Sequence, residues 1–107
     1  MIRATYVRTL KPGVTDEQFI AAWMPPGQTV DTYPARVTIS HGLADERQII
    51  STFELDIPAE RLADALPTLV HPDSTRRLAE IVESTQLEAV FEDTGVFGEA
   101  DPQIRPV

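Results

Sequence analysis

Apolar side chains in the first third of the chain follow two spacings, and each spacing predicts one element. Residues 2–10 alternate between two faces, neither of them strongly polar, as in a central strand that is covered on both sides. A capping box formed by Thr15 and Gln18 then begins a helix, which ends at the turn residues 25–27. The chain therefore opens with a strand and a helix.

Two further strands follow, and both are rich in β-branched or aromatic residues. Residues 35–41 and 48–55 are joined by a short link that contains Gly42, which is typical of a hairpin. Leucines at helical spacing come next, in a helix with Pro58 in its first turn. We expect this helix to break or kink at Pro67, because an interior proline costs about 3 kcal/mol.

The last third predicts one more helical piece and a final strand. The helix resumes at Asp73 or Ser74, either of which suits a cap. Residues 87–94 alternate again as a strand, and residues 95–98 are a candidate extension past a bulge. The order of elements is then β-α-β-β-α-β, with the second helix in two pieces.

That order predicts the ferredoxin-like fold, an α+β fold with an antiparallel sheet and its helices on one face. We expect one such domain at residues 1–99, with residues 100–107 as a C-terminal tail or dimer arm. The other face of the sheet carries Thr5, Val7 and Val90 rather than charges. A second copy of the same face would cover it, which predicts a homodimer.

The element order, the chain length and the Trp23-bearing first helix resemble the dimeric α+β barrel superfamily over residues 2–97. This superfamily includes antibiotic-biosynthesis monooxygenase-like, ethyl-tert-butyl-ether-degradation (EthD)-like and stress-responsive barrel domains. The resemblance implies a homodimer with a ligand cleft between sheet and helices in each protomer. Its members include cofactor-free oxygenases, isomerases and haem-handling proteins. No catalytic residue set of any branch matches this chain position by position, so the resemblance assigns no residue a role.

Charge and composition narrow the possible partners. Nine Lys and Arg face seventeen Asp and Glu, and the net charge of −8 disfavours both nucleic acid and anionic membranes. The absence of Cys excludes disulfides and thiolate chemistry. Neither a signal sequence nor an apolar run of the ~18 residues that a membrane span needs is present. We therefore expect a cytoplasmic protein.

Four polar residues are candidates for catalysis. His41 ends the second strand in phase with its apolar side chains, and His71 lies in the break between the helical pieces. A structural explanation is favoured for each, with His41 as a solvated histidine beside a turn and His71 as a histidine at a helix end. Arg8 either reaches solvent from a strand end or binds a carboxylate or enolate in a cleft. Tyr6, on the same face, is either a core residue or a polar group in a pocket.

Aromatic residues suggest what such a pocket would hold. Trp23, Phe19 and Phe53 would suit an apolar or aromatic small molecule, although residues at this spacing also form ordinary core. No metal-binding spacing of His, Asp or Glu is present, so no metal site is predicted.

The sequence thus supports three functions and leaves open whether the chain is an enzyme. The first is a dimer that binds a small molecule, as a cofactor-free monooxygenase or an isomerase. In it, His41 or His71 accepts a proton, and Arg8 or Tyr6 stabilises the resulting anion. The second is a non-catalytic dimeric binding or assembly module. The third and weakest is haem binding through one histidine.

Overall fold

The computed structural model describes residues 1–98, and the predicted tail or dimer arm at residues 100–107 lies outside them. The chain forms, in order, β1 (Ile2–Leu10), α1 (Asp16–Trp23), β2 (Arg36–His41), β3 (Gln48–Leu55), the 3-10 turn η1 (Ala59–Arg61), α2 (Leu62–Leu69), α3 (Pro72–Ile81) and β4 (Val82–Glu92). The predicted order of elements is therefore confirmed, including the division of the second helical region into two pieces.

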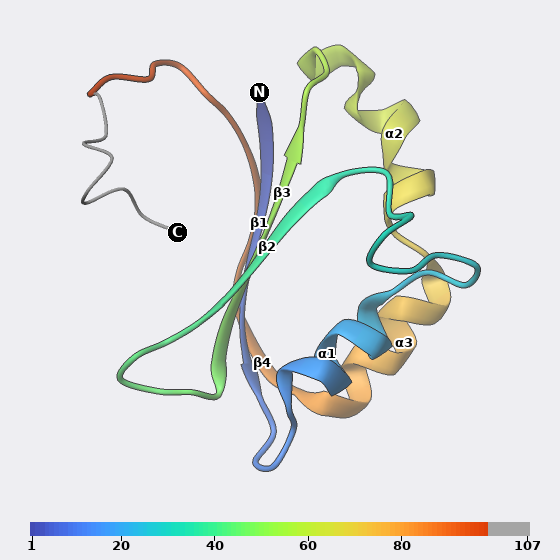
Figure 1. Cartoon of the computed structure of the whole chain (residues 1–107), viewed down its shortest axis with the longest axis vertical. Coiled ribbons are helices and arrows are strands. Elements are labelled where there is room, and N and C mark those ends of the chain that lie inside the picture. The colour runs from blue at the N-terminus through green and yellow to red at the C-terminus, as the bar shows by residue number, and fades with distance from the viewer. Residues whose placement is uncertain (99–107) are drawn as a thin grey trace.

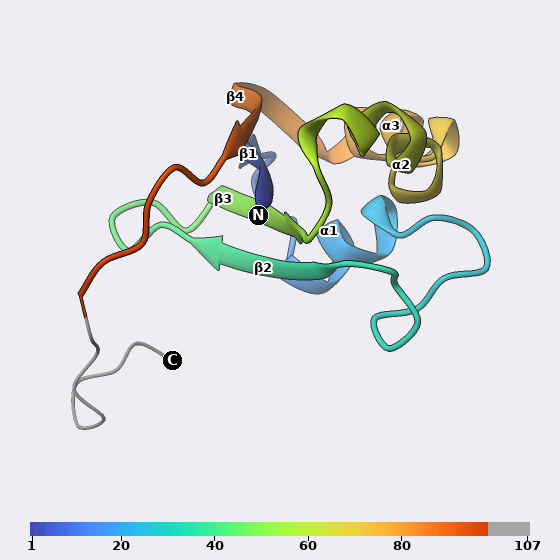
Figure 2. The same ribbon diagram turned by 90° about the horizontal axis from the view of Figure 1, so that it is seen from above.

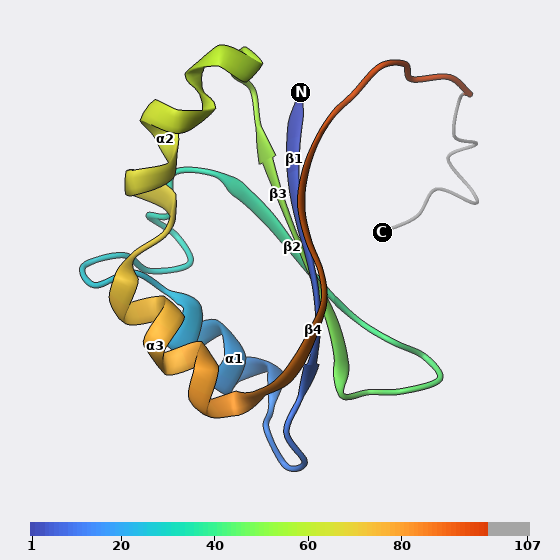
Figure 3. The same cartoon turned by 180° about the vertical axis from the view of Figure 1, so that it is seen from behind.

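Antiparallel pairing joins the four strands in the order β2-β3-β1-β4. This is the strand order of the ferredoxin-like fold. Helices α1, α2 and α3 cover one face of the sheet, and no helix of the described chain covers the other face (Figures 1 and 3). The view from above shows the same two layers (Figure 2). The predicted α+β class, with helices on one face of an antiparallel sheet, is confirmed.

The register of β1 decides which strand residues meet beneath the helices. Tyr6 lies opposite Ser51 of β3 on one side and opposite Glu88 of β4 on the other. Residues directly opposite each other in antiparallel strands point to the same face, so these three side chains are neighbours. The fully buried pair Ala4 and Phe53 belongs to the same face, which is the one covered by helices.

Helix α1 begins as the sequence predicts. The Thr15 hydroxyl accepts a hydrogen bond from the Gln18 N–H (3.1 Å), and the Gln18 side-chain oxygen accepts one from the Thr15 N–H (2.9 Å). This capping box satisfies two N–H groups that would otherwise lack a partner. Phe19 and Trp23 are the buried residues of α1, because a spacing of four places both on the side facing the sheet.

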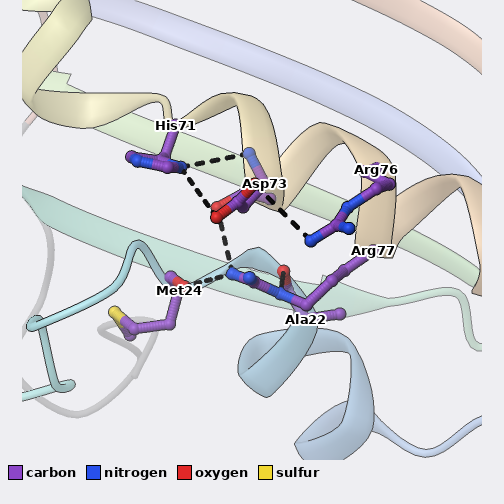
Figure 4. Close-up of polar contacts among 7 residues, drawn as sticks. Ala22, Met24, His71, Asp73, Arg76 and Arg77 are labelled. Atoms are coloured by element: carbon purple, nitrogen blue, oxygen red, sulfur yellow. Dashed lines mark hydrogen bonds and ion pairs between the residues drawn. The ribbon is translucent and has the colours of Figure 1, made fainter.

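A guanidinium from α3 holds the other end of α1. Arg77 donates from Nε to the Ala22 carbonyl (3.0 Å) and from Nη2 to the Met24 carbonyl (2.7 Å) (Figure 4). A cation is favourable at the C-terminus of a helix, where carbonyl groups have no partner within the helix. This contact ties α1 to α3, which lie side by side, and fixes the last turn of α1, where Trp23 is located.

Of the break or kink predicted at Pro67, the break does not occur there, and the kink stays a prediction. Helix α2 continues through Pro67 to Leu69, and the break falls at Val70 and His71. Proline removes one intrahelical hydrogen bond, the one to the Ala63 carbonyl, and both residues are exposed, so water can replace the lost donor. Burial of Leu69 against the end of the sheet holds the last turn in place.

Strand β4 is longer than predicted, and its two faces are the reverse of those expected. It starts at Val82, directly after α3, instead of at Leu87. Two shifts of register occur near this start, whereas residues 95–98 form no strand. Val90 lies opposite Ala4 and therefore belongs to the helix-covered face, not to the bare face predicted for it. The alternation in this strand was correct, but alternation alone does not say which set points inward.

Candidate functional site

A cavity of about 380 Å³ lies between the sheet and the helices. Residues of β1, β3 and β4 form its floor, and the end of α2, the helix break and α3 form its cover. The volume is within the roughly 300–1,000 Å³ that is usual for small-molecule sites. We call it the Arg8 cavity, because Arg8 supplies the positive charge of its lining.

Four of the seven predicted site residues line the Arg8 cavity, namely Tyr6, Arg8, Trp23 and Phe53. The first two come from β1, where a spacing of two places them on one face. Trp23 comes from the last turn of α1, and Phe53 from β3. The strand and helix spacings thus bring polar and aromatic side chains into one space, while the roles predicted for them stay predictions.

Aromatic rings form one wall of the cavity. The ring centroids of Trp23 and Phe53 are 4.9 Å apart in an edge-to-face arrangement, and those of Tyr6 and Phe53 are 5.6 Å apart. Tyr33, which sequence analysis did not single out, packs on Trp23 at 4.6 Å and donates its hydroxyl to the Leu69 carbonyl (2.8 Å). Burial raises the pKa of Tyr33 well above its usual range. These contacts pack the aromatic side chains against one another, with Trp23 and Phe53 lining the cavity.

Phe19, the third aromatic residue predicted for the pocket, lies behind this wall. It has no exposed surface and belongs to the hydrophobic core. Its ring centroid is 5.9 Å from the Arg8 guanidinium carbon, whereas that of Tyr6 is 4.6 Å away. Phe19 therefore makes a weak cation–π contact with Arg8 from within the core.

The Arg8 guanidinium has no carboxylate partner among residues 1–98. Its one hydrogen bond is a long one, from Nη1 to the Ser51 hydroxyl (3.4 Å). Burial lowers the pKa of Arg8, and the nearby Tyr6 and Glu88 oppose this effect only in part. Four of its five N–H groups thus have no protein acceptor among the described residues.

Tyr6 is held in its neutral form beside this arginine. Burial raises the pKa of Tyr6, the negative charge of Glu88 raises it further, and Arg8 acts in the opposite direction. A neutral phenol can donate a hydrogen bond as well as accept one. The cavity floor therefore offers hydroxyl and guanidinium donors side by side.

Neither histidine lines the Arg8 cavity. His41 is half exposed at the end of β2, and its Nδ1 lies 3.5 Å from the carboxylate of Asp16 in the first turn of α1. His71 caps the N-terminus of α3, where its Nδ1 accepts a hydrogen bond from the Asp73 N–H (3.0 Å) (Figure 4). The cap of α3 is thus His71, not the predicted Asp73 or Ser74.

Glu88 is the site residue that sequence analysis missed. The acidic residues of the last strand suggest a solvated surface, and Glu88 is indeed exposed, but it also lines the edge of the Arg8 cavity. The signal that would identify it is its register opposite Tyr6, which needs the pairing of β1 with β4. The other acidic lining residue, Glu83, is already paired with Arg47 (3.4 Å).

An open groove of about 510 Å³ continues outward from the edge of the cavity, between α2 and β4. The cavity and the groove share three lining residues, Tyr6, Val70 and Glu88. The rest of the groove is apolar and includes Leu66 and Val90. The groove therefore places apolar surface next to the cavity.

Residues 1–98 show neither a metal-binding cluster nor a helix that could span a membrane. No cluster of three or more His, Asp or Glu residues there is arranged to hold a metal ion. No helix between residues 1 and 98 is both long and apolar enough to cross a membrane.

Comparison with known proteins defines the fold. No family model matches the chain, and no curated protein matches it in sequence. Among solved structures, the chain is similar to a candidate antibiotic biosynthesis monooxygenase from Chloroflexus aurantiacus J-10-fl, with a TM-score of 0.58 and 15% identity over 91% of this chain and 96% of that one. It is also similar to an uncharacterized NIPSNAP domain protein from Burkholderia xenovorans, with a TM-score of 0.60 and 13% identity over 92% of this chain and all of that one.

These similarities, at low identity, concern the fold alone. The two solved chains are covered almost completely, and the strand order of this sheet is the ferredoxin-like one. The chain thus has the ferredoxin-like fold, as its element order predicts. Its pairing, ligand and chemistry do not follow from the fold.

Proposed function

We propose that this chain binds a small apolar or aromatic molecule in the Arg8 cavity. The observation that carries the proposal is the lining, in which two aromatic rings lie beside polar donors on the cavity floor. Trp23 and Phe53 supply the wall, and Tyr6 and Arg8 supply the donors. Predominantly apolar walls with a small number of placed polar groups are the usual composition of ligand sites.

The same arrangement supports cofactor-free chemistry on the bound molecule. Such a reaction starts when a base removes a proton from a carbon next to a carbonyl group, which leaves an enolate. Arg8 and Tyr6 would stabilise the enolate oxygen by hydrogen bonds. An isomerase returns the proton to another carbon. A monooxygenase instead adds one atom of O₂ to the deprotonated carbon, which becomes a carbonyl, and the other oxygen atom leaves as water with the two hydrogens of that carbon, so the substrate supplies both electrons.

Glu88 replaces the histidines as the proposed proton acceptor. It lines the cavity edge beside Tyr6, whereas His41 and His71 lie outside the lining. This placement also argues against haem in the Arg8 cavity, because neither histidine of the chain is placed to bind its iron there. The proposed function therefore uses no haem and no histidine.

We also propose that the bare face of the sheet pairs with a second copy of the chain. Ile50, Leu87 and Phe91 lie on this face with 38%, 39% and 48% of their surface exposed. The charge of Arg3 on the same face is neutralised by Glu54 (2.7 Å) and Asp93 (2.9 Å). Exposed apolar side chains beside an internally paired arginine suit a symmetric interface.

The bare face also favours a second candidate, a dimeric module without catalysis. Pairing would then be the whole function, and the Arg8 cavity would hold only solvent. Ligand binding separates the two candidates, because an assembly module gains nothing from an aromatic ligand in its cavity.

Binding is tested with the neutral probe N-phenyl-1-naphthylamine, which accepts excitation energy from tryptophan. Trp23 is the only tryptophan of the chain and lies in the cavity wall. We expect saturable quenching of its emission at one probe per chain. Ala79→Phe should abolish quenching, because Ala79 lines the cavity, whereas Glu80→Phe adds the same ring at a residue outside the lining and should leave it intact. Absence of saturable quenching in the unchanged chain would refute the proposal.

A further inference from the structure

We infer that the ligand of the Arg8 cavity is a small aromatic carboxylic acid, whose carboxylate binds the Arg8 guanidinium. This inference rests on the proposed function and specifies the class of molecule bound. Arg8 is partly buried, yet it contacts no anion and no carbonyl group among the described residues.

Four arginines of the described chain are partly buried, and three of them have a strong acceptor. Arg3 is paired with Glu54 and Asp93, Arg47 with Glu83, and Arg77 with two backbone carbonyls at the end of α1. Arg8 contacts only a neutral hydroxyl at 3.4 Å and the faces of two aromatic rings. It is therefore the partly buried arginine of residues 1–98 whose charge no anion or carbonyl balances.

Partial burial of an unbalanced guanidinium is unfavourable. Desolvation penalises the charge, and it lowers the pKa of Arg8, whereas ion pairing raises the pKa of Arg3 on the opposite face of the same strand. An anion in the cavity would reverse this penalty. The strand thus carries two arginines in contrasting states, one satisfied within the fold and one open to a ligand.

The groups around Arg8 favour a carboxylate among anions. The guanidinium is a planar fork that matches the two oxygens of a carboxylate. The Tyr6 phenol stays protonated and can donate a further hydrogen bond to the same head group. Trp23 and Phe53 lie beyond it, where a ring attached to the carboxylate would pack.

Glu88 limits the charge of the ligand. It forms no ion pair within residues 1–98 and stands at the cavity edge, close enough to Tyr6 and Arg8 to influence both. The Glu88 carboxylate would repel a second negative charge on the ligand. A monocarboxylate with its ring toward the aromatic wall avoids it, so we expect Glu88→Gln to tighten the binding of a monocarboxylate.

The test compares 2-naphthoate with its neutral isostere 2-naphthamide by isothermal titration calorimetry at neutral pH. Hydrogen bonds to a charged group contribute about 1.5–3 kcal/mol, so naphthoate should bind about ten to a hundred times more tightly. Arg8→Gln should remove this preference while the amide still binds, which shows that the cavity persists. Arg36→Gln is the matched control, because Arg36 is 79% exposed on the edge strand β2 and should leave the preference unchanged.

The outcomes separate the two proposals. If acid and amide bind the unchanged chain equally, the inference is overturned while the proposed function stands. If Arg8→Gln keeps the preference for naphthoate, a different cation is responsible and the inference is again overturned. If neither compound binds and N-phenyl-1-naphthylamine also fails to bind, the proposed function falls together with the inference.

Discussion

Arg77→Ala tests whether the contact between α1 and α3 sets the position of the cavity wall. The substitution removes both hydrogen bonds that Arg77 donates to the carbonyls of Ala22 and Met24 (3.0 and 2.7 Å). Those carbonyls are only partly exposed, so they lose a charged donor and regain water incompletely. The last turn of α1, with Trp23, is left without this support.

The expected cost follows from the two hydrogen bonds. A hydrogen bond with a charged partner contributes about 1.5–3 kcal/mol, so two give about 3–6 kcal/mol. Partial solvation of both carbonyls places the cost of Arg77→Ala near the lower end, at about 3 kcal/mol. This is a large share of the roughly 5–15 kcal/mol by which a small domain is stable. With a urea m-value of about 1–3 kcal/mol/M, the unfolding midpoint should fall by about 1–3 M.

Arg76→Ala is the control, since Arg76 is the next residue of the same helix. Arg76 is exposed, and its side chain makes one weak contact with Asp73 at 3.5 Å (Figure 4). Surface contacts of this kind contribute about 0–1 kcal/mol. Urea unfolding followed by Trp23 fluorescence measures both variants. If Arg77→Ala costs no more than Arg76→Ala, the contact does not hold α1, and the reasoning about the wall is refuted.

Two further predictions concern pH and assembly. Burial raises the pKa of both Tyr6 and Tyr33, so the folded chain favours the neutral phenols. This preference contributes fully to the free energy of unfolding below the unfolded-state pKa of about 10. The contribution is lost as the pH rises from there toward the pKa values of the folded chain. Tyrosinate absorbance should therefore appear at higher pH in the folded chain than in urea, and equal titration midpoints would contradict the burial of the two rings. In sedimentation velocity, we expect the chain to sediment as a dimer and Leu87→Asp as the 11.9 kDa monomer, whereas Leu43→Asp, at a fully exposed residue of the β2–β3 turn, should stay dimeric. A chain that sediments only as the monomer would rule out the pairing.

Most helices and strands of the fold could be predicted, because the spacing of apolar residues and the helix caps depend on residues that are close in sequence. The capping box at Thr15 and Gln18 forms as expected, since both partners lie within one turn. The strand at residues 48–55 has the predicted bounds, because alternation and β-branched residues agree there. Pro67 misled the prediction, since the intrinsic cost of proline takes no account of an exposed helix face or of the burial of Leu69.

The candidate site was predicted less completely than the fold. Tyr6 and Arg8 share a face by simple alternation, so their common location could be inferred from the sequence. Glu88 and Ser51 join them only through the pairing of distant strands, which the sequence does not specify residue by residue. The histidines attracted attention by their chemistry alone, and the structure places both outside the cavity lining.

Helix α3 passes directly into β4, with no loop between Ile81 and Val82. Both faces of this strand take part in the proposed functions. Its inward residues, such as Thr85, line the Arg8 cavity, while its outward residues, such as Leu87, lie on the face proposed to pair. If a ligand and a second chain both use β4, thermodynamic reciprocity applies to them. Whatever factor the ligand contributes to dimer affinity, dimerisation must return to ligand affinity. Ligand binding in the Arg8 cavity and dimerisation through the bare face would then be coupled through β4.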